Sequence, residues 1–261
     1  MKYAKSQRSN LGKGMQIIIT MAGKGQRFRD AGYDVPKYMI EAKGKTLFEW
    51  SMDSLLDYNP YTSKYIFVVR KEDNASDFIS EKCSKLGVND VTIVELDHTT
   101  DGQATTCFLA VKYCNPDESI LVYNIDTYVE PFEMKYKSIV GDGHIPCFSA
   151  PGTHWSFVKT DSDSNALEVR EKERISDNCT LGAYYFSSAK LYKQIYNEYY
   201  VDDSHMEKNE KYIAPLYNYM IEIGMTVTIS SIDSTKVHVL GTPDELQLFL
   251  TQSEKSPTSK R

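Results

Sequence analysis

A glycine-rich, basic loop follows the first apolar run of the sequence. Gly23, Lys24, Gly25 and Arg27 come directly after residues 16–22 (QIIITMA), a pattern typical of a buried strand that ends in a tight loop. Glycines let the backbone approach a ligand closely, and free N–H groups in such a loop suit phosphate oxygens. The loop is therefore a candidate phosphate site, although a simple chain reversal has the same local pattern.

Two well-known phosphate motifs do not explain this region. A dinucleotide-binding fingerprint needs a third glycine where Phe28 stands. A Walker loop ending in residues 44–46 (GKT) needs a glycine where Met39 stands. The loop must therefore be judged by the charges around it.

A further lysine strengthens the phosphate interpretation. Lys37 follows Pro36, whose ring fixes the local backbone, and it lies within fourteen residues of Lys24 and Arg27. Three cations around a glycine loop, at the carboxyl edge of a parallel sheet, would bind several negative charges together. We expect Lys37 to belong to this site; taken alone it would be a solvated surface lysine.

A carboxylate is expected at the same edge of the sheet. Asp126 comes directly after an apolar run, residues 119–125 (SILVYNI). In an open α/β sheet, the carboxyl ends of the strands face the ligand crevice. Mg²⁺ bound with a nucleotide takes one or two carboxylates together with phosphates and waters, so a single aspartate is enough for a metal site. The alternative is an aspartate that only stabilises a turn.

These side chains require elements that bring them together. Strand and helix patterns alternate four times over the first half of the chain, with strands at 16–22, 65–69, 91–96 and 119–125 and helices at 46–56, 75–86 and 104–113. Strands rich in Ile and Val indicate a parallel sheet covered on both faces. The second half changes character, with a β-hairpin at 155–160 and 166–170, a strand at 181–186, helices at 189–199, 212–223 and from 243, and strands at 226–232 and 236–239. We therefore predict an α/β fold with a Rossmann-like, mostly parallel mixed sheet flanked by helices and elaborated by a β-hairpin.

Composition limits the remaining function classes. The 261 residues are 41% hydrophobic and 25% charged, which is ordinary for a globular protein. A net charge of −6 argues against a protein that wraps nucleic acid. The five cysteines form no CxxC pair, and no run is long enough to cross a membrane. We expect a cytoplasmic protein with free thiols, one catalytic domain at 15–250, a leader or added extension at 1–14 and a flexible tail at 251–261.

The order of the motifs resembles that of the nucleotidyltransferases. The blocks are MAGKGxR (21–27), PK (36–37), DGQATT (101–106), NID (124–126), EK (171–172) and GTPDEL (241–246). The resemblance spans residues 16 to 250 and is to the sugar-phosphate and phosphocholine-type enzymes with a glycosyltransferase-A-like fold. More narrowly, the chain is similar to the cytidylyltransferases of capsule modification. That narrower resemblance implies CTP as donor and a phosphorylated acceptor such as phosphoglutamine.

The resemblance implies a role for each block. It places the nucleotide against Met21, Ala22, Gly23, Lys24, Gly25 and Arg27 through its phosphates, and against Gly102 and Gln103 through its base and ribose. Lys37 would stabilise charge at the α-phosphate, Asp126 would bind Mg²⁺, and Lys172 with Glu171 would contact the acceptor phosphate. The alternatives are that residues 102–103 only begin a helix and that residues 171–172 are a charge pair at a hairpin end.

One position departs from the family pattern. Many sugar-phosphate members carry an aspartate, as a second metal ligand, two residues before the final Gly-Thr-Pro, and here that position is Val239. Either Asp126 suffices or another acid substitutes, of which Asp233 is the candidate.

The implied reaction is direct transfer of a nucleoside monophosphate, with loss of pyrophosphate. Its partners are a nucleoside triphosphate and a phosphorylated small molecule, with no nucleic acid and no membrane, and the protein would be a monomer or a homodimer. Two alternatives stay open: a sugar-1-phosphate nucleotidylyltransferase that uses UTP or dTTP, and a non-catalytic nucleotide-binding homologue. A glycosyltransferase is disfavoured, because a loop that grips a triphosphate tail has no purpose with a nucleotide-sugar donor.

Overall fold

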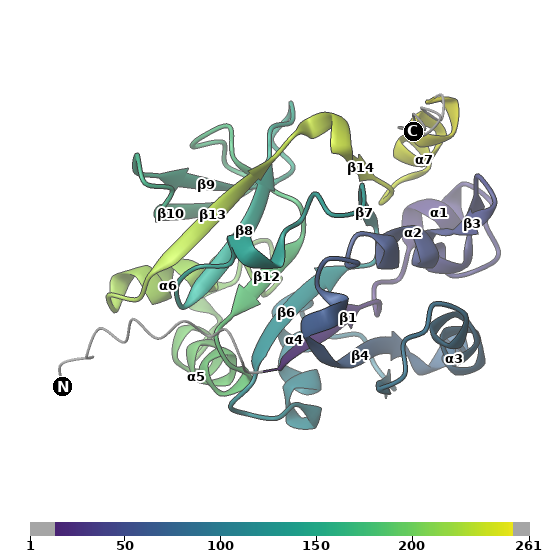
Figure 1. Ribbon diagram of the computed structural model, residues 1–261, viewed down its shortest axis with the longest axis horizontal. Coiled ribbons are helices and arrows are strands. Elements are labelled where there is room, and N and C mark those ends of the chain that lie inside the picture. The colour runs from purple at the N-terminus through teal and green to yellow at the C-terminus, as the bar shows by residue number, and fades with distance from the viewer. Residues whose placement is uncertain (1–13, 253–261) are drawn as a thin grey trace, which may run out of the picture.

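A ten-stranded sheet organises residues 14–252, the part of the chain that the structure, a computed structural model, describes (Figure 1). Four parallel strands lie side by side at one end of it, in the order β6 (Ser119–Asn124), β1 (Met15–Thr20), β4 (Thr62–Arg70) and β5 (Val91–Leu96). All four were expected as strands from their apolar runs. Because they are parallel, their carboxyl ends meet at one edge, which is where the predicted site residues lie.

The second half of the chain extends the sheet with mostly antiparallel pairs. β12 (Ala183–Phe186) pairs antiparallel with β6. Beyond it lie β8 (Gly143–Phe148), β11 (Cys179–Thr180), β9 (Ser156–Thr160) and β10 (Ala166–Glu171), while β13 (Val227–Ile232) pairs parallel with β8. The predicted hairpin is confirmed as β9 and β10. The mixed, mostly parallel α/β fold is likewise confirmed.

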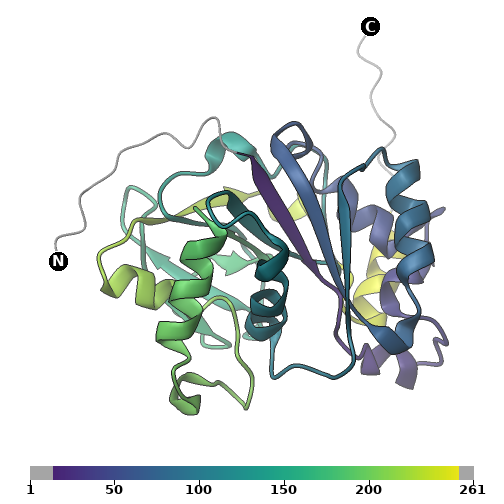
Figure 2. The ribbon, with the colours of Figure 1, turned by 90° about the horizontal axis from the view of Figure 1, so that it is seen from below.

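Helices cover both faces of the sheet, as the apolar strands predicted. Successive strand side chains point to opposite faces. Ile17 and Ile19 accordingly pack in one cluster with residues of α2 (Leu47–Asp53) and α3 (Ser76–Lys85). Ile18 packs on the other face with α4 (Gln103–Ala110), α5 (Ala189–Tyr199) and α6 (Leu216–Glu222). Figure 2 shows α3 on one side of the parallel strands and α4 and α5 on the other.

A third, smaller core lies at the edge of the molecule where α1 and α7 meet. It joins Phe28 of α1 (Gln26–Asp30) to Phe249 of α7 (Pro243–Thr251). The short pairs β7 (Thr127–Val129) with β14 (Val237–Val239) and β2 (Glu41–Ala42) with β3 (Lys45–Thr46) flank this core. It ties the last helix to the glycine loop.

Several element boundaries differ from the sequence-based prediction. The helix expected at 46–56 ends at Asp53, and the one expected at 212–223 begins at Leu216, because Pro215 takes the capping position. The sequence pattern did not predict β8, because Pro146 interrupts the apolar run that indicates a strand. The strand expected from 181 begins at 183, after Gly182 with its φ of 87°.

Other sequence-based expectations can be compared directly. All five cysteines are free, as predicted. No helix within residues 14–252 is long and apolar enough to cross a membrane. The expected leader at 1–14 and tail at 251–261 fall almost wholly outside the described residues.

A histidine is buried without charge between β8 and β13. His144 is 1% exposed, and its Nδ1 and Nε2 lie 2.8 Å and 3.0 Å from the hydroxyls of Thr228 and Ser230. Thr228 donates its own proton to the carbonyl of Val140, so its oxygen accepts from Nδ1 of a neutral ring. Burial lowers the pKa of His144 to about 4.

This burial makes stability depend on pH. Because the folded pKa lies below the unfolded value, the unfolded chain binds more protons, and acidification from about pH 6.5 towards 4 favours unfolding. We expect His144 to remove about 2–3 kcal/mol from the free energy of unfolding between about pH 7 and 4.5. In urea titrations, the free energy of unfolding of His144→Gln should therefore fall by about 2–3 kcal/mol less than that of the wild type over this pH range. The exposed His98, changed to Gln, should keep the wild-type dependence, and equal slopes in both variants would contradict the prediction.

Candidate active site

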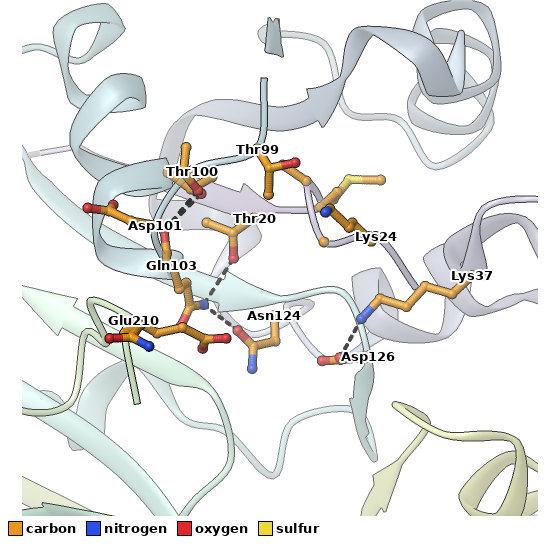
Figure 3. Close-up of a pocket in the computed structure, with 16 residues that line it drawn as sticks. Thr20, Lys24, Lys37, Thr99, Thr100, Asp101, Gln103, Asn124, Asp126 and Glu210 are labelled. Carbon is orange, nitrogen blue, oxygen red and sulfur yellow. Dashed lines mark hydrogen bonds and ion pairs between the residues drawn. The ribbon is translucent and has the colours of Figure 1, made fainter. Parts of the chain in front are cut away.

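A cavity of about 640 Å³ opens at the carboxyl edge of the parallel strands (Figure 3). Its walls come from the ends of β1 and β6, the loop after β5, Lys37, and a segment from the second half of the chain. The lining residues are Thr20, Met21, Ala22, Gly23, Lys24, Lys37, Thr99, Thr100, Asp101, Gly102, Gln103, Thr106, Asn124, Asp126, Asn209 and Glu210. Ligands of open α/β sheets bind at this edge, so the cavity is the candidate active site.

The glycine loop forms one end of the cavity. Gly23 and Lys24 line it, while Gly25 has a φ of 62° and caps α1. A Cβ at Gly25 would lie 4.0 Å from Cβ of Lys37, so the loop passes directly beside that lysine. Arg27 is exposed on α1 and does not line the cavity.

Lys37 and Asp126 meet inside the cavity, 89 positions apart in the sequence. The ammonium of Lys37 donates to Oδ2 of Asp126 at 2.6 Å, and the two side chains are 18% and 27% exposed. Figure 3 shows them at the end of the cavity that also holds Lys24. The sequence predicted both residues for one site, and the structure brings them into contact. A partly shielded cation and a carboxylate therefore lie in contact beside the glycine loop.

The structure does not bring Asp233 to Asp126. Asp233 caps a 3₁₀ turn by accepting from the N–H of Thr235 at 2.8 Å. β14 runs antiparallel to β7 with Val239 opposite Thr127, so the chain between 239 and 233 leads away from Asp126. The sequence alone does not predict the direction of the chain between residues 233 and 239, because that direction depends on the β7–β14 pairing.

A different carboxylate approaches Asp126. A Cβ at Gly241 would lie 3.3 Å from Oδ2 of Asp126 and 3.5 Å from Oε2 of Glu245, so both oxygens flank the same point. Glu245 lies in the first turn of α7, where Thr242 caps the helix. No group of three or more His, Cys, Asp or Glu side chains fit to hold a metal ion occurs among residues 14–252.

Polar side chains connect three elements at the middle of the cavity. Nε2 of Gln103 donates to Oγ1 of Thr20 at 2.9 Å and to Oδ1 of Asn124 (Figure 3). These residues come from α4 and from the ends of β1 and β6. Gln103, predicted to lie against the base and ribose, is therefore held in one orientation.

A segment from the second half closes one side of the cavity. The N–H of Lys211 donates to the carbonyl of Asp101 at 2.7 Å, and the carbonyl of Lys211 accepts from Ala104 at 3.0 Å. The side chains of Lys211 and Asp101 form an ion pair at 2.9 Å. These contacts bring Asn209 and Glu210 to the cavity. Sequence reasoning missed both, because the polar stretch around them matches no motif.

The predicted acceptor residues lie behind this segment and do not line the cavity. Nζ of Lys172 donates to the hydroxyl of Tyr212 at 2.6 Å and lies 3.7 Å from Oε1 of Glu171. The Glu171 side chain is 6% exposed, and burial raises its pKa. Burial and the nearby carboxylate of Glu210 raise the pKa of Tyr212. Tyr212 therefore lies between Lys172, which donates to its hydroxyl, and Glu210, which lines the cavity.

Comparison with solved structures places this geometry in a family. The chain is similar to the nucleoside-diphosphate-sugar pyrophosphorylase of Vibrio cholerae RC9, with 38% identity and a TM-score of 0.84 over 90% of this chain and all of that one. The chain therefore belongs to the nucleotidyltransferase family that this protein represents. No family model matches the sequence, and none of the curated proteins matches it.

More distant structures share the fold. The inositol-1-phosphate CTP transferase of T. maritima is 17% identical with a TM-score of 0.71, over 90% of this chain and 92% of that one. HddC from Yersinia pseudotuberculosis is 17% identical with a TM-score of 0.62, over 90% and 99%. At such identities the likeness concerns the architecture alone.

Gly102 should be irreplaceable in the cavity wall. Its φ is 144°, and a Cβ there would lie 2.3 Å from the carbonyl oxygen of Lys211. We expect Gly102→Ala to lower the free energy of unfolding by about 2–4 kcal/mol, because the two backbones must separate. The control is Gly23→Ala, where a Cβ meets nothing within 4 Å, so stability should hold. Equal thermal unfolding midpoints for the two variants would contradict the prediction.

Proposed function

We propose that the protein transfers a nucleoside monophosphate from a triphosphate to a phosphorylated small molecule and releases pyrophosphate. The observation that carries this proposal is the Lys37–Asp126 contact of 2.6 Å beside the glycine loop in the cavity. A cation and a carboxylate next to a loop that accommodates phosphate are the groups that phosphoryl-transfer chemistry needs. Membership of the nucleotidyltransferase family supports the same reaction class.

The chain's own groups supply positioning and charge neutralisation. An oxygen of the acceptor phosphate attacks the α-phosphorus in line, and the bond from that phosphorus to the bridging oxygen of the β-phosphate breaks as pyrophosphate leaves. The acceptor phosphate is already anionic at neutral pH, so no side chain has to act as nucleophile or general base. Lys37 would stabilise charge at the α-phosphate, and Lys24 with the loop N–H groups would hold the leaving phosphates.

Mg²⁺ is the proposed cofactor, and the donor set fits it. A carboxylate at the phosphate end of the cavity, beside room for phosphate oxygens, is the arrangement in which Mg²⁺ is held by one or two carboxylates plus substrate. Asp126 lines the cavity and would hold the ion directly, while the Glu245 carboxylate lies nearby but does not line the cavity. When bound, Mg²⁺ neutralises phosphate charge and polarises the phosphorus under attack.

We propose CTP as the donor and a phosphorylated amino acid, phosphoglutamine, as the acceptor. The activity would then be that of a CTP:phosphoglutamine cytidylyltransferase. The motif resemblance supports this choice. Gly102 and Gln103 would lie against the base and ribose. Glu210 lines the cavity on the side of the proposed acceptor pair Glu171–Lys172, and its carboxylate would meet the acceptor's ammonium group.

A second function has specific support. The relative that is 38% identical is named as a nucleoside-diphosphate-sugar pyrophosphorylase, which favours a sugar phosphate as the acceptor. The donor in this alternative would be UTP or dTTP. Sugar hydroxyls would also donate to Glu210. A non-catalytic homologue is the third possibility, since Val239 replaces the usual second acid; Glu245 beside Asp126 is an argument against it.

Pyrophosphate release tests the reaction and its two central residues. The wild-type protein with Mg²⁺ should release pyrophosphate from CTP faster than from UTP, dTTP or other triphosphates when phosphoglutamine is the acceptor. Lys37→Ala and Asp126→Ala should each lower kcat at least about a hundredfold, because each removes charge stabilisation in the transition state. The matched control is Lys45→Ala, a lysine outside the cavity that loses an ion pair with Asp53 and a contact with the Trp50 ring.

The alternatives have distinct results in that assay. Preference for a sugar 1-phosphate with UTP or dTTP would replace the cytidylyltransferase assignment. Activity near the wild-type level in Lys37→Ala would contradict the proposed mechanism. If no pyrophosphate is released with any donor and acceptor, the protein would be a non-catalytic homologue.

Glu210 tests the nature of the acceptor. A carboxylate in a site for a dianionic phosphate is favourable only when the acceptor presents a cation or hydrogen-bond donors to it. If the acceptor carries an ammonium group, Glu210→Gln should raise the KM for that acceptor by roughly 10- to 100-fold, the value of a charge-assisted hydrogen bond. KM for the triphosphate should change little. The control is Glu207→Gln, a neighbour that does not line the cavity; equal effects of the two variants would refute a direct contact.

A further inference from the structure

A buried carboxylate outside the cavity connects the elements that carry the phosphate-binding cations. Asp73 ends the 3₁₀ turn Lys71–Asp73 that follows β4, and its side chain is 2% exposed. Nη2 of Arg70 donates to its Oδ1 at 2.5 Å, and the hydroxyl of Tyr38 donates to its Oδ2 at 3.1 Å. Nη2 of Arg29 forms a longer ion pair with Oδ1 at 3.9 Å.

Each of these partners leads to a part of the candidate site. Tyr38 follows Lys37 directly in the same 3₁₀ turn, and its ring is 1% exposed in the core. Arg29 lies in α1, and its Nε donates to the carbonyl of Lys24 at 3.2 Å. Arg70 is the last residue of β4, two positions after Val68, whose carbonyl accepts from Met21 at 2.8 Å. None of these four residues lines the cavity.

Stability alone does not account for this arrangement. A buried ion pair gains little over well-packed apolar side chains, because both charges lose their hydration. Nε of Arg70 is moreover buried without a hydrogen-bond partner among the described residues, which adds a cost. The network instead joins separate elements: the hydrogen bonds from Arg70 and Tyr38 connect the end of β4 to the Lys37 turn, and the longer, half-exposed Arg29 ion pair adds α1.

We propose that Asp73 is a positioning residue for nucleotidyl transfer, holding Lys37 through Tyr38 and the glycine loop through Arg29. This inference rests on the function proposed above and adds residues that the transfer mechanism does not name. Asp73 touches no substrate; it sets where the ammonium of Lys37 and the backbone of Lys24 stand. A displacement of about 1 Å at such groups can cost a hundredfold in rate.

Three variants test the proposal by separating kcat from KM. Tyr38→Phe keeps the ring and removes only the hydroxyl that holds the Lys37 turn, so kcat should fall about tenfold while KM for CTP changes less than about twofold. Asp73→Asn releases the loop as well, so kcat should fall and KM for CTP should rise. The control is Tyr65→Phe, a buried tyrosine of the same core that loses a hydroxyl bond to Asn59 and should keep both constants. Thermal unfolding of each variant reports its loss of stability.

The outcomes separate the two proposals. If the wild-type protein is active and Tyr38→Phe has the same kcat as Tyr65→Phe at similar loss of stability, Asp73 has no positioning role and the proposed function stands. A lower kcat in Tyr38→Phe, with Tyr65→Phe unaffected, supports the positioning role even if Asp73→Asn fails to fold. A wild-type protein inactive with every triphosphate and acceptor would overturn the proposed function, and the positioning role with it.

Discussion

The contact between Lys37 and Asp126 is the constraint on which the rest of the structure depends. One residue follows a proline near the start of the chain, and the other comes directly after the fourth predicted strand, yet their charged atoms lie 2.6 Å apart. The parallel sheet delivers Asp126 to its carboxyl edge, and Lys37 reaches the same edge from the 3₁₀ turn Lys37–Met39. The backbone around Asp126 is held from both halves: Ile125 accepts from the hydroxyl of Ser51, and Asp126 accepts from the N–H of Leu240.

The local charge of the site therefore differs from that of the whole chain. The sequence carries a net charge of −6, while the glycine loop and Lys37 place cations at one end of the cavity. Because Asp126 pairs with Lys37, this end offers opposite charges in contact and partly shielded from water. Such groups interact more strongly than they would in bulk water, which suits stabilisation of charge that shifts between phosphates.

The sequence predicted the four parallel strands and half of the residues that line the cavity at their carboxyl edge. Asp126 was predicted because it follows an expected strand end, and Lys37 because it follows Pro36 near the basic glycine loop, whereas Gln103 came from the family resemblance. Glu210 was not found, since its place depends on backbone hydrogen bonds between Lys211 and residues 101–104. Asp233 was named only as a candidate for a second metal ligand. The pairing of β14 with β7 leads the chain away from Asp126, and no local pattern indicates that pairing.

The last helix explains why a motif so late in the chain belongs to a site built mainly by the first half. α7 places Phe249 in the same small apolar core as Phe28, which belongs to the helix that follows the glycine loop. The turn before α7 brings Leu240 to the backbone of Asp126 and Glu245 towards its carboxylate. The phosphate end of the cavity is therefore a joint product of both halves, and its geometry depends on their packing as one core.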